Sequence, residues 1–130
     1  MQTLTISYNQ LFVANEKSEV PVIDWTDEDL QKGYMVFDEG IVFEALCNTS
    51  CEITVSIGNI VQKEGALRIM SVPFDVTETT IIVYSILSEK LWFSVPKGSY
   101  NLSVQVIPLQ KPTDDELYSI RYECYFTAIS

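Results

Sequence analysis

The sequence predicts an all-β fold, an antiparallel β-sandwich or partly open barrel of about eight strands, with one short helix near residues 26–32. Apolar and polar residues alternate with a period of two in several separate segments, and turn-forming residues fall between them. Short strands at this spacing are typical of sandwiches and barrels. With 130 residues, 47% of them hydrophobic, the chain can bury one core, so we expect a single domain over residues 1–130.

Seven segments are predicted as strands from their apolar patterns. Those that alternate, and so should bury one face and expose the other, are residues 4–8, 53–57, 102–106 and 118–122. Those with denser apolar runs, expected at more central positions of a sheet, are residues 41–43, 81–84 and 91–93. The breaks between strands are expected at Gly40, residues 47–51, Gly58-Asn59, Pro73, residues 88–89, Pro96-Lys97-Gly98 and residues 112–115.

One stretch, DWTDEDLQKGY, interrupts the strand pattern. Thr26 can cap the start of a helix, and Asp29 three residues later completes a capping box, although Glu or Gln is preferred there. The acids of the first turn suit the positive end of the helix dipole, and Gly33 suits the position after the last turn. We therefore expect a helix of one to two turns on a loop between strands.

The net charge of −10 argues against direct binding to nucleic acid or to an anionic membrane, because both are negatively charged. It favours a basic protein or a divalent cation as partner, although many proteins are acidic only for solubility. Between Glu16 and Glu44 there are nine acids and two bases, a net charge of −7 in under a quarter of the chain. This concentration weakens the solubility explanation.

Catalytic and metal sites find little support. The chain has no histidine, the commonest general base, although a pair of carboxylates could still serve a glycosidase. An EF-hand beginning at Asp24 would lack its glycine and its bidentate glutamate, while a looser calcium site remains open. Cys47, Cys51 and Cys124 are too few for a four-ligand zinc site and are expected to be reduced structural thiols. We expect no enzyme activity, no cofactor and no metal.

A protein interface is the better hypothesis for the acidic region. Aromatic residues inside a charged rim are what interfaces use for affinity and steering. Trp25 serves equally well as an interface anchor or as a core residue that packs the helix onto the sheet. The predicted partner-binding residues are Asp24, Trp25, Asp27, Glu28, Asp29, Tyr34, Asp38 and Glu39.

Several blocks of sequence resemble the competence protein J family of DNA-entry nuclease inhibitors. They are Leu4-Thr5-Ile6-Ser7-Tyr8, Asp24 to Glu28 with Lys32-Gly33-Tyr34, Val72-Pro73-Phe74 with Val76-Thr77-Glu78, and Pro96-Lys97-Gly98 with Tyr100 and Leu102. The blocks keep the family's order and approximate spacing over nearly the whole chain. Residues 58–68 and 111–125 match no pattern of the family.

The resemblance implies a small non-enzymatic inhibitor that silences a DNase linked to DNA uptake in bacteria. From the charge of the chain, we expect it to act by placing its acidic surface in the basic groove that holds DNA. The alternatives are a small-ligand or carbohydrate-binding sandwich, in which Trp25, Tyr34 and Trp92 stack on sugars, and a structural subunit. No basic leader or long apolar run is visible, so we expect the protein in the cytoplasm and not in a membrane. The oligomeric state stays undetermined.

Overall fold

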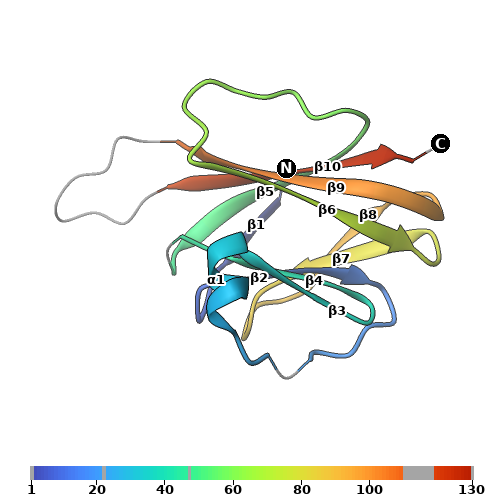
Figure 1. The fold of residues 1–130 in the computed structure, drawn as a ribbon, viewed down its shortest axis with the longest axis horizontal. Coiled ribbons are helices and arrows are strands. Elements are labelled where there is room, and N and C mark those ends of the chain that lie inside the picture. Colours follow the sequence, from blue (N-terminus) through green and yellow to red (C-terminus); the bar gives the residue numbers. More distant parts are fainter. Residues whose placement is uncertain (1, 22, 47, 110–118, 130) are drawn as a thin grey trace, which may run out of the picture.

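Two five-stranded β-sheets pack face to face and form a sandwich, as Figure 1 shows. The computed structural model describes residues 2–21, 23–46, 48–109 and 119–129. The predicted fold class is therefore confirmed, with ten strands in the described residues in place of about eight and no closed barrel.

The first sheet, sheet A, contains both the N-terminal and the C-terminal strand. Its strands, in spatial order, are β1 (Gln2–Thr5), β5 (Ser50–Ile57), β10 (Ile120–Ala128), β9 (Gly98–Pro108) and β6 (Arg68–Val76). All neighbours are antiparallel except β5 and β10, which run parallel. The sequence predicts an antiparallel sandwich, but the sandwich is not purely antiparallel, because this one pair of strands is parallel.

The second sheet, sheet B, is antiparallel throughout. Its strands, in spatial order, are β3 (Tyr34–Phe37), β4 (Gly40–Glu44), β2 (Gln10–Asn15), β7 (Thr80–Tyr84) and β8 (Leu91–Ser94). Side chains on its inner face, such as Leu11, Val13 and Phe43, are fully buried against sheet A. This inter-sheet layer is the main hydrophobic core and supplies most of the burial that holds the fold together.

The outer face of sheet B is also apolar, and a second, smaller cluster forms there. Phe12, Ala14, Val42, Ile82 and Tyr84 are buried in it, and residues of the segment that precedes the helix pack onto them. The rings of Phe12 and Tyr84 stack with centroids 4.8 Å apart. A loop therefore covers a face that would otherwise be solvated.

The outer face of sheet A is covered by residues 58–67, which cross it between β5 and β6 (Figure 1). Gln105 of β9 is fully buried beneath this segment, where its side chain bonds the backbone nitrogen of Lys63 and the carbonyl of Val61. Ser103 is buried as well. The expectation that the polar residues of 102–106 face solvent was wrong. The covering segment supplies Gln105 with partners, and Ser103 Oγ lies 2.8 Å from Ser71 Oγ on β6.

The three apolar runs do not all lie at the centre of a sheet. Residues 41–43 and 81–84 lie in β4 and β7, which have neighbours on both sides, but Leu91–Phe93 form the edge strand β8. Trp92 on this edge is 52% exposed. A dense apolar run favours burial on both faces of a strand, but it does not show whether a further strand pairs beyond it, and on this edge one face stays exposed.

Three strands were not expected, namely β2, β3 and β6. In β6 the alternation of buried and exposed residues is regular, but Pro73 in its middle predicts a strand break. Proline lacks the N–H that a central strand donates, and β6 tolerates it because it is an edge strand.

The predicted strand at residues 4–8 ends earlier, since Tyr8 lies in a turn with φ of 56°. Cys47, residues 112–115 and Tyr118 fall outside the described residues.

The helix is confirmed as α1 (Asp27–Lys32). Thr26 Oγ1 accepts a hydrogen bond from the Asp29 backbone nitrogen at 3.1 Å, and Asp29 Oδ2 accepts one from the Thr26 nitrogen at 3.1 Å. Gly33 follows with φ of 86°, the left-handed conformation that ends many helices. In the part of the chain that the structure describes, no helix is long and apolar enough to cross a membrane.

Candidate functional site

The predicted partner-binding residues fall into two groups at opposite ends of strand β3. Asp24, Trp25 and the acids of α1 lie before Tyr34, while Asp38 and Glu39 form the turn between β3 and β4. At about 3.3 Å per residue, the four steps from Tyr34 to Asp38 separate the two groups by about 13 Å. Figure 1 shows α1 at one end of the sandwich and the β3–β4 turn at the other.

In the group near α1, most of the acids are free to meet a partner. Asp24, Asp27 and Glu28 are exposed, and no cation among the described residues lies within ion-pair distance of them. Asp29 is different, because the backbone N–H of Thr26 and then its hydroxyl hold the pKa of the Asp29 carboxyl below its usual value. The Asp29 carboxylate is therefore engaged in capping α1 and is less available to a partner than the other three acids.

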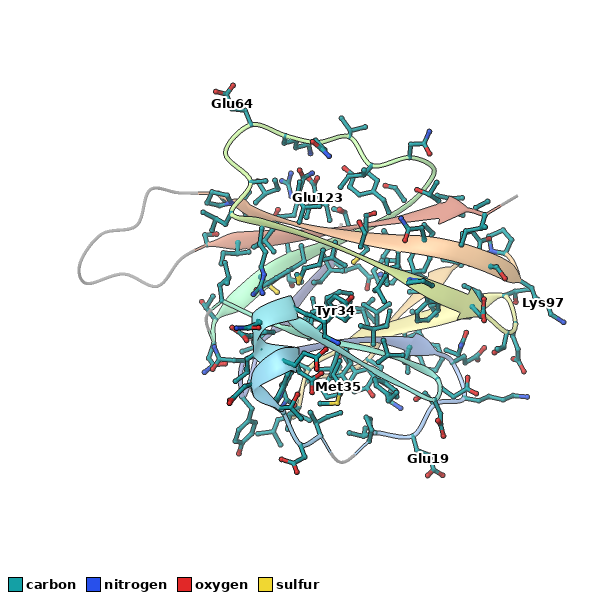
Figure 2. The ribbon with its side chains drawn as sticks, in the orientation of Figure 1. Glu19, Tyr34, Met35, Glu64, Lys97 and Glu123 are labelled. Carbon is teal, nitrogen blue, oxygen red and sulfur yellow. The ribbon has the colours of Figure 1, made fainter. Side chains whose placement is uncertain are left out.

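The two aromatic residues of the predicted site are partly used by the fold. Trp25 packs against the cluster on the outer face of sheet B, and Tyr34 packs against the main core with Lys32 Nζ 5.3 Å from its ring centroid. Figure 2 shows Tyr34 directed between the sheets and Met35 directed to the opposite side of sheet B. Trp92 lies on β8, at the opposite edge of the sheet from Tyr34, so the three rings form no common surface for sugar stacking.

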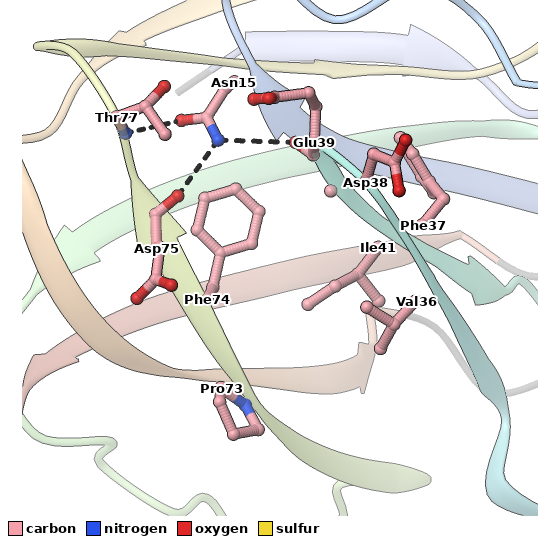
Figure 3. Close-up of a pocket in the computed structure, with 11 residues that line it drawn as sticks. Asn15, Val36, Phe37, Asp38, Glu39, Ile41, Pro73, Phe74, Asp75 and Thr77 are labelled. Carbon is pink, nitrogen blue, oxygen red and sulfur yellow. Dashed lines mark hydrogen bonds between the residues drawn. The ribbon is translucent and has the colours of Figure 1, made fainter.

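The group at the β3–β4 turn borders a cleft between the two sheets, shown in Figure 3. The cleft has a volume of about 240 Å³ and is lined by Val36–Ile41 of sheet B and by Pro73, Phe74, Asp75 and Thr77 from the β6 side. Buried Asn15 joins the two sides: its Nδ2 donates to the Asp75 carbonyl at 3.0 Å, and its Oδ1 accepts from the Thr77 nitrogen at 3.0 Å. The Asn15 backbone nitrogen donates to the Glu39 carbonyl at 2.9 Å.

Sequence reasoning missed Asp75, which is exposed and lines the same cleft as Asp38 and Glu39 from the opposite side. No local pattern marks it, because it comes from β6 and reaches the turn only through the packing of the two sheets. The nearby block Val76-Thr77-Glu78 was noted for its resemblance to a family and not for its charge. The cleft end of the sandwich is therefore acidic from both sheets.

Neither group of acids is arranged around a metal. Among the described residues, no three Asp, Glu, Cys or His side chains converge in a way that could hold an ion. Cys51 and Cys124 are buried in sheet A, and burial raises the pKa of the Cys124 thiol to about 12. Cys124 thus remains protonated and serves packing.

These features define a class: a small acidic β-sandwich whose exposed carboxylates are suited to contact another macromolecule. The particular family follows from comparison with known proteins. The chain belongs to the Competence protein J (ComJ) family, which matches residues 3–127.

Two similar proteins agree with this assignment. The DNA-entry nuclease inhibitor of Bacillus subtilis (strain 168) is 40% identical over 109 residues, which are 84% of this chain and 83% of the relative. The crystal structure of ComJ from Bacillus subtilis, described as the inhibitor of the DNA-degrading activity of NucA, has a TM-score of 0.88 and 36% identity. That match covers 98% of this chain and 94% of the other. The protein is thus a homologue of a nuclease inhibitor, which is not an enzyme.

Proposed function

We propose that this protein binds a DNA-entry nuclease and inhibits it by placing an acidic surface in the groove that holds DNA. The observation that carries the proposal is the match in fold and sequence to an inhibitor of NucA over nearly the full length of both chains. At this level of identity the whole sandwich is shared, so a shared type of partner is the simplest expectation.

The charges of the protein support the acidic-surface part of the proposal. A nuclease that acts on DNA needs a cationic groove for the phosphates. A protein of net charge −10 is attracted to such a groove, and exposed carboxylates without cations near them can replace phosphates there. Asp24, Asp27 and Glu28 near α1, and Asp38 at the β3–β4 turn, meet this condition, and half-buried Glu39 follows Asp38 in the same turn.

Both groups fit within a single interface. A standard interface covers about 800 Å² on each partner, a patch wide enough to span the roughly 13 Å between the two ends of β3. Inhibition in the cytoplasm is part of the same proposal. The buried thiol of Cys124 fits a reducing compartment.

The test is a DNase assay with the cognate DNA-entry nuclease, and with NucA of Bacillus subtilis as a second target, at low and at high salt. We expect dose-dependent inhibition that weakens as salt rises, since screening reduces electrostatic attraction. Inhibition that does not respond to salt would keep the inhibitor function and reject the acidic-surface mechanism. Absence of inhibition of both nucleases at micromolar protein would reject the function itself.

A matched pair of variants locates the surface. Glu28→Lys and Glu64→Lys each reverse one exposed charge and change the net charge from −10 to −8, since each adds two units. Glu64 lies on the segment that covers sheet A, far from α1 (Figure 2). We expect Glu28→Lys to slow association about 3–10-fold at low salt with little change in dissociation, and Glu64→Lys to act weakly. Equal effects of the two variants would mean that only net charge matters.

A further inference from the structure

Two large apolar side chains are exposed on backbone that disfavours them. Tyr8 is 68% exposed with φ of 56°, and Leu87 is 86% exposed with φ of 68°. Positive φ is uncommon for residues other than Gly, Asn and Asp, and it costs free energy for a bulky side chain. Apart from Asn9, which neighbours Tyr8, they are the only such non-glycine residues in the part of the chain that the structure describes.

Tyr8 lies in a tight turn between β1 and β2. The Gln10 nitrogen donates to the Ser7 carbonyl at 3.2 Å, and both central residues of the turn, Tyr8 and Asn9, have positive φ. Such turns favour Asn, Asp or Gly at both positions, so Asn9 fits and Tyr8 does not. Asn9 and Asn48 fix the turn through a reciprocal pair of hydrogen bonds of 2.7 and 3.1 Å.

Leu87 lies in a second turn, from Ser85 to Ser88, between β7 and β8. The Ser88 nitrogen donates to the Ser85 carbonyl at 3.1 Å, and the Ser85 nitrogen donates to Ser88 Oγ at 2.7 Å. With positive φ at its third residue, this turn favours Gly or Asn at the position that Leu87 occupies. Leucine there exposes nearly its whole side chain and forms no core contact that would offset the strain.

The two turns are joined by one buried side chain. Ser85 Oγ accepts from the Ser7 nitrogen at 2.9 Å and lies 2.6 Å from the Gln10 carbonyl, to which it can donate. Tyr8 and Leu87 consequently line the same open hollow, together with Ser7, Asn9 and Asn48. Because hydrogen bonds fix both turns, the backbone positions of Tyr8 and Leu87 are set before a partner binds.

This hollow continues toward α1. Tyr8 and Asn9 also line a second hollow, together with Trp25, Leu30 and Leu46. Leu30 and Leu46 are exposed, and Asp27 lies one helical turn before Leu30 on the same face of α1. Leu87, Tyr8, Leu46 and Leu30 therefore form an apolar strip that ends beside the exposed acids of the helix.

We propose that this strip is the apolar anchor of the interface with the partner nuclease, with the acids of α1 as its charged rim. The proposal rests on the proposed function. Protein interfaces place aromatic and aliphatic anchors centrally and charges around them. The fitting partner surface is the edge of a basic groove with an apolar patch next to it. Backbone strain at exposed positions commonly marks functional sites, and the acids beside the strip supply the charge complementarity.

The test combines stability with binding. Leu87→Asn and Tyr8→Asn each place at a strained position a residue that tolerates positive φ. We expect each to raise Tm by about 2–4 °C and to weaken binding to the cognate nuclease by at least about tenfold. A variant that folds better but binds worse cannot owe its loss of binding to unfolding.

Val61→Asn is the matched control, because Val61 is 63% exposed but lies on the segment over sheet A without positive φ. It should leave nuclease binding unchanged. Wild-type-like binding by Leu87→Asn and Tyr8→Asn would overturn the proposed anchor while the inhibitor function stands. A fall in Tm would overturn the strain argument on which the anchor depends. A wild-type protein that inhibits no nuclease would overturn both proposals.

Discussion

The ammonium group of Lys63 lies 2.5 Å from the carboxylate of Glu123, which is buried on the outer face of sheet A (Figure 2). The same carboxylate accepts from the Tyr125 hydroxyl at 2.9 Å and from Gln105 Nε2 at 3.2 Å. Arg121 Nη1 is 3.5 Å from it. One buried acid thus holds the covering segment 58–67 onto the sheet, and this explains why a charged residue occupies a buried position.

Replacement of Glu123 by glutamine tests this arrangement. Glu123→Gln keeps the shape of the side chain but removes the charge that Lys63 and Arg121 face, so we expect a loss of about 1–3 kcal/mol of stability by urea denaturation. Inhibition by the folded variant should not change, because the network lies away from α1. Glu64→Gln, one residue from Lys63 but exposed, is the control and should be neutral. A neutral Glu123→Gln would mean that the network adds no stability.

The same carboxylate predicts a pH dependence. Burial tends to raise the pKa of Glu123, but hydrogen bonds from Lys63, Tyr125 and Gln105 outweigh it, and the pKa is lowered overall. A lowered pKa in the folded state stabilises the protein above the pKa of the unfolded chain, about 4.3, and this contribution is lost as pH falls through the folded pKa. The difference in unfolding free energy between wild type and Glu123→Gln should therefore be constant above about pH 5 and shrink below about pH 4. A difference that already shrinks between pH 7 and pH 6 would contradict this assignment.

Removal of the Tyr84 hydroxyl should stabilise the protein, whereas removal of the Glu123 charge should destabilise it. The Tyr84 hydroxyl is buried on the outer face of sheet B and has no hydrogen-bond partner among the described residues, and burial raises the pKa of Tyr84 to about 12. A buried polar atom without a partner costs about 1–3 kcal/mol. Tyr84→Phe should therefore raise the unfolding free energy by about 1 kcal/mol and keep the ring stacked on Phe12. Destabilisation would show that the hydroxyl is satisfied in solution.

The capping box of α1 can be removed separately from its charge. Thr26→Ala deletes the oxygen that accepts from Asp29 and should cost about 1 kcal/mol of stability. Because Thr26→Ala keeps the exposed acids of the helix, inhibition should fall only in proportion to the fraction of molecules in which the first turn of α1 is unfolded. Thr26→Ser, which retains the hydroxyl, should behave as the wild type in both denaturation and nuclease assays. If Thr26→Ser also loses stability, the stabilising group is the methyl group of Thr26 and not its capping hydroxyl.

The helix was predictable because its signals are local. Thr26, Asp29 and Gly33 act within one or two turns of chain, and each performs the role that its chemistry suggests. The alternating strands were predictable for the same reason. Leu91–Phe93 were misplaced because an apolar run does not show how many neighbours a strand has, and β6 was missed because Pro73 is allowed only on an edge that the sequence does not show.

The candidate site was predictable only in part. The acids near α1 are close in sequence, whereas Asp75 joins Asp38 and Glu39 only through the packing of two sheets. Tyr8 was read as the continuation of a strand, because the alternation from Leu4 extends to it and the sign of φ leaves no mark in the residue pattern. Leu87 was not singled out, since leucine rarely occupies such a turn position.

The most direct test of the central claim is hydrogen exchange of the protein alone and in complex with its cognate nuclease. If the α1 end is the interface, amides of the Ser7–Gln10 turn, of α1 and of the Ser85–Ser88 turn will gain protection in the complex. The amides of residues 58–67, on the far side of sheet A, will exchange as in the free protein. Protection confined to residues 58–67, with the two turns and α1 unchanged, would contradict the account.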